Sequence, residues 1–417
     1  MLTSFVWIPK GAMKSVPIQS SDSIDQVREK LRKQNPDYVE DELPSEEKGH
    51  LSRGDEDEGS DNDGEDNVFD RIGGADQVLE DIESDDDEEI DDTTFKETDL
   101  PFVATRADQQ DPKVEVYVYD EPEDNVYVHH DATVSAFPLC STWMSDGTMS
   151  LAAVGTMLPF VEIWPLDVID AVEPVCLLGG CVNSEDNYRR KLKKDRLKPD
   201  SHKEAVLSIQ WNTLVQHILA SGSADHTIKL WDLNQQECVG TYHETEKIQS
   251  LEWHAQEANL LLSGAFDGNA ILRDCRRPDD AAMKWELGDV VERVAFGHHT
   301  NVVYASTSDG RLMCLEMRRN AQPLWTIQPH DKETTFACSR HLPGLIATGG
   351  KDGFLSLYDA RAAGAEPTLI VSRKYKTGSV LNIAFHPNSP HLLGAGGSRG
   401  QPLVYTMTQD LNTVFAQ

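Results

Sequence analysis

The feature of this sequence that most constrains its fold is a repeat of about forty residues. The stretch LASGSADHTIKLWDL contains a small residue, a turn aspartate and a strand that ends in an aromatic residue followed by an acid. Similar stretches recur, with strand-end positions at Trp164, Trp231, Arg273, Leu315, Tyr358 and Tyr405. The three spacings after Trp231 are 42, 42 and 43 residues, whereas the 67-residue spacing before it indicates an insertion. Units of ~40–45 residues with strands separated by Asp-Gly or Asp-His turns are typical of four-stranded propeller blades.

A second series of short runs follows the same period. VLSIQW, IQSLEW, VERVAF and VLNIAF alternate apolar and polar residues, and they end in an aromatic side chain at Trp211, Trp253, Phe296 and Phe385. Alternation of this kind predicts a half-buried β-strand. The chain is therefore predicted to be all-β.

The segment before Trp164 supplies a further blade. KVEVYVYD ends at Tyr119-Asp120, 45 residues before Trp164, with strand-like runs on either side. The missing inner strand is predicted at the very N-terminus, where LTSFVWIP places Trp7 in the aromatic position. The first blade would then be split, with one strand at 2–9 and three at 100–130. The prediction is a seven-bladed WD-repeat β-propeller, with a six-bladed propeller as the alternative.

This organisation divides the chain into three regions. Residues 1–10 form the inner strand of blade one, 11–99 form an insertion, and 100–417 form the propeller with a basic loop at 180–201. Within the insertion, SDSIDQVREKLRKQ has a narrow apolar stripe behind a Ser/Asp start, which predicts a short helix.

The rest of the insertion is strongly acidic. The whole chain has a formal net charge of -33. From Glu40 to Asp99 there are 27 acidic and 4 basic residues, so this segment alone carries 4 − 27 = −23. It cannot bury enough apolar surface to offset chain entropy, so we expect a disordered acidic insertion. It either solubilises the protein or attracts basic partner proteins.

Two serines stand at the head of acidic runs in this insertion. Ser84 precedes DDDEEI and Ser60 precedes DNDGED. Both are candidate phosphorylation sites for an acidophilic kinase of the casein-kinase type. Phosphorylation would add further negative charge to a segment that already repels itself.

The first clear repeat contains the ingredients of a Ser–His–Asp hydrolase. They are His202, Ser221 and Asp225, followed by Trp231. A hydrolase needs one such triad beside an oxyanion hole, not a variant copy in every repeat. We therefore predict a structural hydrogen-bond network inside a blade, which satisfies polar groups that would cost ~1–3 kcal/mol each if buried unpaired.

Other chemical signatures also favour a binding protein over an enzyme. GAGGSRGQP lacks the lysine of a phosphate-binding loop, and the seven cysteines include no CxxC pair. The adjacent histidines His129-His130 and His298-His299 are expected to point to opposite faces of their strands, which disfavours a metal site. The sequence contains no run of about 18 apolar residues, so no membrane span is predicted. We expect no catalytic site, cofactor, metal or small-molecule substrate.

A basic stretch lies in the insertion that lengthens one repeat. YRRKLKKDRLKP supplies the seven cations Arg189, Arg190, Lys191, Lys193, Lys194, Arg196 and Lys198. It is a candidate nuclear-localisation signal or a contact with RNA phosphates, and a solvated linker is the alternative. Because no aromatic residues interleave with the cations, base stacking is not predicted.

Several longer stretches resemble the periodic tryptophan protein family of nucleolar WD-repeat proteins. They are FVWIPKGA, VEVYVYDE, NVYVHHD, FPLC, VEIWPLDVIDAVEP and LRDCR. The resemblance implies a role in ribosome biogenesis, mainly in assembly of the large subunit, with reported family links to ribosomal RNA gene transcription and chromatin. Arg273, Leu315 and Arg399 depart from the expected blade residues, and we expect weaker internal hydrogen bonding in their blades.

The sequence and the resemblance therefore lead us to expect one of two functions. The first is a non-enzymatic scaffold that assembles large-subunit precursors in the nucleus and nucleolus, with ribosomal proteins and pre-ribosomal RNA as partners. The alternative is a chromatin- or histone-binding propeller that regulates ribosomal RNA genes. A ligase-type substrate receptor has no supporting motif, and no membrane partner is expected. Because strands alternate in direction within a blade, the acidic and basic insertions should be anchored on opposite faces of the propeller.

Overall fold

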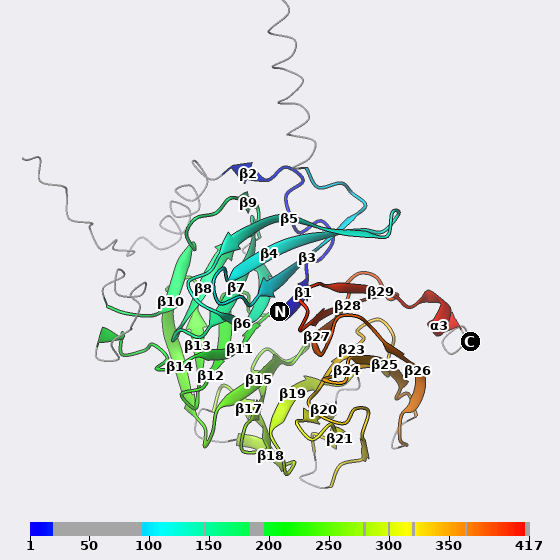
Figure 1. The fold of residues 1–417 in the computed structure, drawn as a ribbon. Coiled ribbons are helices and arrows are strands. Elements are labelled where there is room, and N and C mark those ends of the chain that lie inside the picture. The colour runs from blue at the N-terminus through cyan, green and yellow to red at the C-terminus, as the bar shows by residue number, and fades with distance from the viewer. Residues whose placement is uncertain are drawn as a thin grey trace, which may run out of the picture.

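The computed structural model describes residues 1–19, 94–145, 147–182, 196–277, 281–298, 301–318, 322–362 and 365–412. These residues form seven radial β-sheets around a common centre (Figure 1). The predicted seven-bladed propeller is confirmed, and the six-bladed alternative is wrong. In the described part of the chain, no helix is both long and apolar enough to cross a membrane.

The strands of each blade are given from the innermost outward. The first blade contains β1 (Leu2–Trp7), β3 (Asp99–Arg106), β4 (Lys113–Asp120) and β5 (Asn125–Thr133). The second contains β6 (Pro138–Ser145), β7 (Ser150–Thr156), β8 (Phe160–Pro165) and β10 (Cys176–Gly179). The third contains β11 (Val206–Trp211), β12 (Ile218–Ser223), β13 (Thr227–Asp232) and β14 (Glu237–His243). The fourth contains β15 (Ile248–Trp253), β16 (Leu260–Ala265), β17 (Asn269–Asp274) and β18 (Ala281–Glu286).

The remaining blades follow the same order. The fifth contains β19 (Val291–Phe296), β20 (Val302–Thr307), β21 (Leu312–Glu316) and β22 (Trp325–Ile327). The sixth contains β23 (Thr334–Cys338), β24 (Leu345–Gly350), β25 (Phe354–Asp359) and β26 (Thr368–Lys374). The seventh has three strands among the described residues: β27 (Val380–Phe385), β28 (Leu392–Gly397) and β29 (Leu403–Thr406). The short helix α3 (Thr408–Asn412) follows β29, and its Leu411 is buried against the core of the last two blades.

The N-terminal strand closes the ring. β1 pairs antiparallel with β3, so that Trp7 lies opposite Phe102 across a gap of more than ninety residues in sequence. The indole N–H of Trp7 donates to the Ala384 carbonyl of blade seven at 3.0 Å. Trp253 makes the equivalent bond to the Gln210 carbonyl of the preceding blade at 3.1 Å. The first and last blades are therefore joined by the same kind of hydrogen bond that joins blades three and four.

Close packing between blades explains a glycine in the second strand of the repeat. A Cβ atom added to Gly222 would lie 2.6 Å from Cγ2 of Ile248, the first residue of the next inner strand. Gly264 stands in the same relation to Val291, also at 2.6 Å. Only glycine allows neighbouring blades to approach this closely.

The direction of the strands places the anchors of the two insertions at opposite faces. In each blade the first and third strands run one way and the second and fourth run the other. The acidic insertion connects the first and second strands of blade one, β1 and β3. The basic loop connects the last strand of blade two, β10, to the first strand of blade three, β11. Its anchor therefore lies on the other face of the disc.

Candidate functional site

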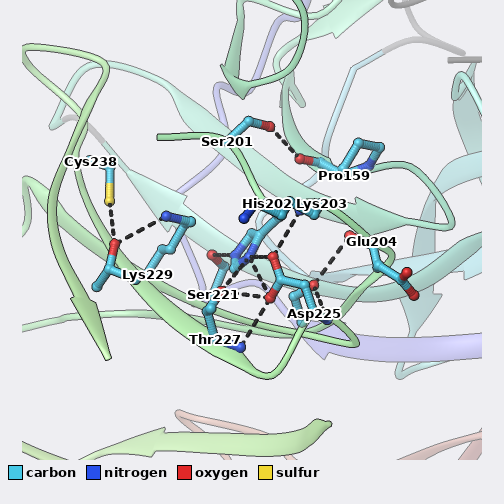
Figure 2. A network of polar contacts seen from close by, with 12 residues as sticks. Pro159, Ser201, His202, Lys203, Glu204, Ser221, Asp225, Thr227, Lys229 and Cys238 are labelled. Atoms are coloured by element: carbon cyan, nitrogen blue, oxygen red, sulfur yellow. Dashed lines mark hydrogen bonds and ion pairs between the residues drawn. The ribbon is translucent and has the colours of Figure 1, made fainter. Parts of the chain in front are cut away.

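The four residues predicted for the blade network lie together in blade three. Figure 2 shows His202, Ser221 and Asp225 converging with Thr227. His202 Nδ1 lies 3.1 Å from Asp225 Oδ2, and His202 Nε2 lies 2.7 Å from Ser221 Oγ. Trp231 donates its indole N–H to Ser221 Oγ at 2.7 Å. His202 and Ser221 are fully buried.

The network is satisfied when His202 is neutral with its proton on Nδ1. Ser221 then accepts from Trp231 and donates to His202 Nε2, while His202 Nδ1–H donates to Asp225. Burial lowers the pKa of His202, although Asp225 opposes this shift. Burial alone would raise the pKa of Asp225, but hydrogen bonds from His202, Thr227 and the Lys203 amide outweigh it and hold the pKa well below its usual range.

This geometry does not suit nucleophilic catalysis. Ser221 accepts a hydrogen bond from Trp231 and is 0% exposed, so its hydroxyl is neither accessible nor free to attack a substrate. A catalytic serine needs a substrate position beside it. The arrangement therefore holds the blade together.

Blade six contains a second network that the sequence analysis missed. His330 Nδ1 lies 3.0 Å from Asp352 Oδ2, and His330 Nε2 lies 3.0 Å from Thr348 Oγ1. The available signal was spacing, because His330 precedes its aspartate by 22 residues and His202 precedes Asp225 by 23.

Blade four replaces the histidine and the tryptophan together. Glu244 and Arg273 lie 42 residues after His202 and Trp231. Arg273 Nε donates to Glu244 Oε1 at 2.9 Å, and both side chains are largely buried. A carboxylate thus replaces the histidine as the partner of Arg273, while Ser263 donates to the Ile271 carbonyl instead. The weaker internal bonding expected for this blade remains a prediction.

The other two departures differ from Arg273. Leu315 is buried in the apolar core, and Arg399 is exposed and donates to the Lys376 carbonyl at 3.1 Å. Weaker internal bonding in these two blades remains a prediction.

Blade two uses a carboxylate on the strand itself. Trp164 donates to Glu162 Oε2 at 2.8 Å, and the Ser135 amide approaches Glu162 Oε1 at 3.3 Å. Burial raises the pKa of Glu162, although these hydrogen bonds oppose the shift. Blades two, three, four and six thus each contain a largely buried polar link, but they do not share a single set of residues.

The stretch LDVIDAVEP anchors the chain where it enters the acidic insertion. Asp167 accepts the Lys14 amide at 2.9 Å through Oδ1 and the Ser150 amide at 2.8 Å through Oδ2. β2 (Ile18–Gln19) pairs in parallel with β9 (Val168–Ile169) of the same stretch. Figure 1 shows this pair at the edge of the disc beside β5.

The far end of the insertion returns to the same place. The Phe95 amide donates to the Ser15 carbonyl at 2.9 Å, and the Phe95 ring stacks on His129 with centroids 4.2 Å apart. The two ends of the insertion are therefore held against each other. The predicted helix at 21–34, most of the acidic tract, Ser60 and Ser84 lie outside the described residues.

His129 and His130 do not point to opposite faces as expected. Val116 pairs with His130 while Tyr117 pairs with Val128, so His129 is the extra residue of a β-bulge. The Nδ1 atoms of the two rings lie 2.8 Å apart, and His130 Nε2 lies 2.9 Å from the Leu166 carbonyl. Burial, with the neighbouring His129, lowers the pKa of His130 to about 4. Among the described residues, no group of three or more potential ligands could hold a metal ion.

The basic loop is fixed at its base. Cys181 and Leu197 form an antiparallel bridge, and the Val182 amide donates to the Arg196 carbonyl at 2.9 Å. Lys198 is exposed. The candidate residues Arg189, Arg190, Lys191, Lys193 and Lys194 lie outside the described residues.

Seven blades, with a buried His–Ser–Asp–Trp link in blade three and a His–Thr–Asp link in blade six, define a WD-repeat β-propeller. The family model "WD domain, G-beta repeat" matches residues 194–232, which include the network of blade three.

Comparison with known proteins places the chain more closely. "Periodic tryptophan protein 1 homolog" of Drosophila melanogaster is 30% identical over 333 residues, which cover 76% of this chain and 69% of that protein. "Periodic tryptophan protein 1" of Saccharomyces cerevisiae is 31% identical over 321 residues, 70% of this chain and 55% of that protein. The chain therefore belongs to the periodic tryptophan protein 1 family.

A more distant match has a functional name. "Ribosome biogenesis protein WDR12 homolog" of Drosophila yakuba is 25% identical over 226 residues, 51% of this chain and 49% of that protein. The chain spans between about half and just over two thirds of the length of these curated relatives.

Proposed function

We propose that this protein is a non-enzymatic scaffold of ribosome biogenesis that assembles large-subunit precursors in the nucleolus. Membership of the periodic tryptophan protein 1 family and the name of the more distant relative support this function. The observation that supports it most is that the strands flanking two oppositely charged insertions end on opposite faces of one disc.

The two insertions suit different partners. The acidic insertion, at 11–99 in the proposed division of the chain, attracts basic ribosomal proteins through a long-range field that salt screens. The basic loop at 180–201 contacts the phosphates of pre-ribosomal RNA and also serves as a nuclear-localisation signal. Phosphorylation of Ser60 and Ser84 strengthens the first attraction without ordering the segment.

We propose a non-enzymatic protein because of the hydrogen-bond network in blade three. The one Ser–His–Asp arrangement identified from the sequence is buried and fully hydrogen-bonded. Function in propellers resides in the loops that a rigid disc presents.

Sedimentation of tagged protein through a sucrose gradient tests the proposal. Co-migration with large-subunit precursors is expected. Nuclease-sensitive association with chromatin, without such co-migration, would instead favour the histone-binding propeller.

A further inference from the structure

A long stretch of this acidic chain contains no acidic residue. The 43 residues from Pro367 to Gln409 include neither aspartate nor glutamate. At the chain's average of 71 acidic residues in 417, a stretch of this length would hold about seven. The stretch forms β26, the outer strand of blade six, and all the described strands of blade seven. These strands and their loops therefore contribute no negative charge to the propeller.

The cations of this stretch gather on one face of the disc. Arg373, Lys374 and Lys376 lie at the end of β26 and in the loop to β27, and Arg399 lies in the turn between β28 and β29. Because strands alternate in direction, loops from a fourth strand to the next first strand lie on the same face as turns between second and third strands. The basic loop at 180–201 also connects a fourth strand to a first one, so it is anchored on this face.

Hydrogen bonds hold the loops of this region against one another. The Ser379 amide donates to Ser398 Oγ at 3.0 Å, and Ser379 Oγ donates to the Lys351 carbonyl at 3.1 Å. Arg399 Nη1 donates to the Lys376 carbonyl at 3.1 Å. The turn after β24, the loop after β26 and the turn after β28 therefore form one continuous surface.

Three cations of this surface are not neutralised by a carboxylate. Arg373 is paired with Asp410, at 2.8 Å, and is therefore left out of the count. Lys374, Lys376 and Arg399 are exposed, and no carboxylate among the described residues forms an ion pair with them. We call these three residues the second basic surface.

Two of these cations are held in place before any ligand binds. Lys374 Nζ lies 5.3 Å from the centroid of the Phe354 ring, a cation–π contact. The guanidinium of Arg399 is fixed by its bond to the Lys376 carbonyl. Because their side chains are already ordered, less conformational entropy is lost when an anion binds.

We propose that the second basic surface binds RNA phosphates on the same face as the basic loop. A nucleic-acid backbone carries a charge at every nucleotide, so it can contact cations that are spread over several loops. Phosphate contacts carry no sequence information, so we expect little preference among RNA sequences. The inference rests on the proposed function, which makes RNA the partner of the basic loop on this face.

The test compares two triple variants of the full chain. The surface variant carries Lys374→Gln, Lys376→Gln and Arg399→Gln. The control variant removes three exposed cations that follow first or third strands and therefore lie on the other face: Lys10→Gln, Arg277→Gln and Arg318→Gln. Each variant changes the formal net charge from -33 to -36, so both repel RNA equally at long range.

Binding to a fluorescent single-stranded RNA of mixed sequence is measured over a range of salt. At about 0.1 M salt the surface variant should bind at least about tenfold more weakly than the wild type, with a slope of log affinity against log salt shallower by ~2, because three fewer phosphates are neutralised. The control variant should behave like the wild type. Equal affinities of the two variants overturn the proposal. So does a wild type that retains polyglutamate in preference to RNA and loses this preference in the surface variant, which would assign the surface to an acidic protein.

A second measurement does not depend on how the variants fold. The unmodified protein is photocrosslinked to RNA that contains 4-thiouridine, and the adducts are mapped by mass spectrometry. Adducts at 374–379 or 398–400 are expected. Adducts confined to the basic loop would remove the second basic surface and leave the proposed RNA contact of the scaffold standing.

Discussion

Single residues hold the blade interior together through polar chains that begin at a donor and end at an acceptor. In blade three the chain runs from Trp231 through Ser221 and His202 to Asp225. Asp225 ends the chain and also accepts the Thr227 hydroxyl at 2.6 Å and the Lys203 amide at 2.8 Å. Removal of this carboxylate would leave several donors unpaired at once.

Asp225→Ala is therefore expected to lower the free energy of unfolding by on the order of 1–3 kcal/mol. Asp200→Ala is a matched control, because Asp200 is an exposed aspartate just before the same loop. Thermal or urea denaturation measures both. If Asp225→Ala melts at the same temperature as the wild type, the network does not stabilise the blade.

His130 makes stability depend on pH. Its folded-state pKa of about 4 lies below the ordinary value of 6.5. Below pH 6.5 the imidazole of His130 is protonated in the unfolded chain but stays neutral in the folded protein. Its contribution to the free energy of unfolding therefore falls as the pH drops from 6.5 towards 4. At pH 5 the loss is on the order of 2 kcal/mol.

We expect His130→Gln to reduce the difference in stability between pH 7 and pH 5. Glutamine keeps a donor for the Leu166 carbonyl but does not titrate. His217→Gln, at an exposed histidine, should leave the difference unchanged. Denaturation curves of the three proteins at both pH values provide the comparison, and parallel behaviour of His130→Gln and wild type would contradict the assignment.

Among the elements, the short strand β1 is the one that closes the propeller. It supplies the inner strand of blade one and contacts the blades on both sides. Phe5 and Phe102 stack with centroids 4.4 Å apart, and Leu392 of blade seven lies in the same core cluster. The acidic insertion leaves from this strand, but its ends are fixed to each other by the bond between Ser15 and Phe95.

Deletion of residues 1–10 should expose the edge of β3 and cause aggregation or early melting. Replacement of residues 20–93 by a short Gly/Ser linker should have little effect on melting, because the ends to be joined already lie together. Light scattering during a thermal melt compares the two proteins. Equal behaviour of the first variant and the full chain would mean that β1 is dispensable.

At the scale of the whole molecule, the two charged insertions are anchored apart. The anchors of the acidic and basic insertions lie on opposite faces of a disc closed by the Trp7 contact with Ala384. The proposed scaffold, which would join basic proteins to RNA, would benefit from this separation of anchors, since each insertion could meet its partner without first meeting the other.

Changing Arg189, Arg190, Lys191, Lys193 and Lys194 to Ala, with a separate import signal attached, should weaken RNA crosslinking. The slope of log affinity against log salt should become shallower by up to ~3.5, because up to five fewer phosphates are neutralised. Arg196 and Lys198 stay unchanged so that the Cys181–Leu197 base of the loop is kept. Capture of a polylysine peptide by the acidic insertion should persist. RNA crosslinking at the wild-type level would reduce the loop to an import signal or a linker.

The sequence by itself determined the architecture of this protein. The period of 42 and 43 residues, the inner-strand pattern and the position of Trp7 predicted seven blades and a split first blade. These features are local, because each strand is specified by alternation within about six residues and each blade repeats the same pattern. The residues of the blade-three network were predictable for the same reason.

Only the tertiary structure decided which polar groups meet. The pairing of Glu244 with Arg273, the bulge that turns His129 towards His130, and the attachment of Lys14 to Asp167 join positions whose register the repeat does not specify. The cavity lined by Gln249, Glu292, Lys351 and Ser398 likewise combines residues of four blades. Hydrogen bonds and cavities depend on strand register and on ångström-scale approach between distant segments, which a one-dimensional pattern of apolar and polar residues does not encode.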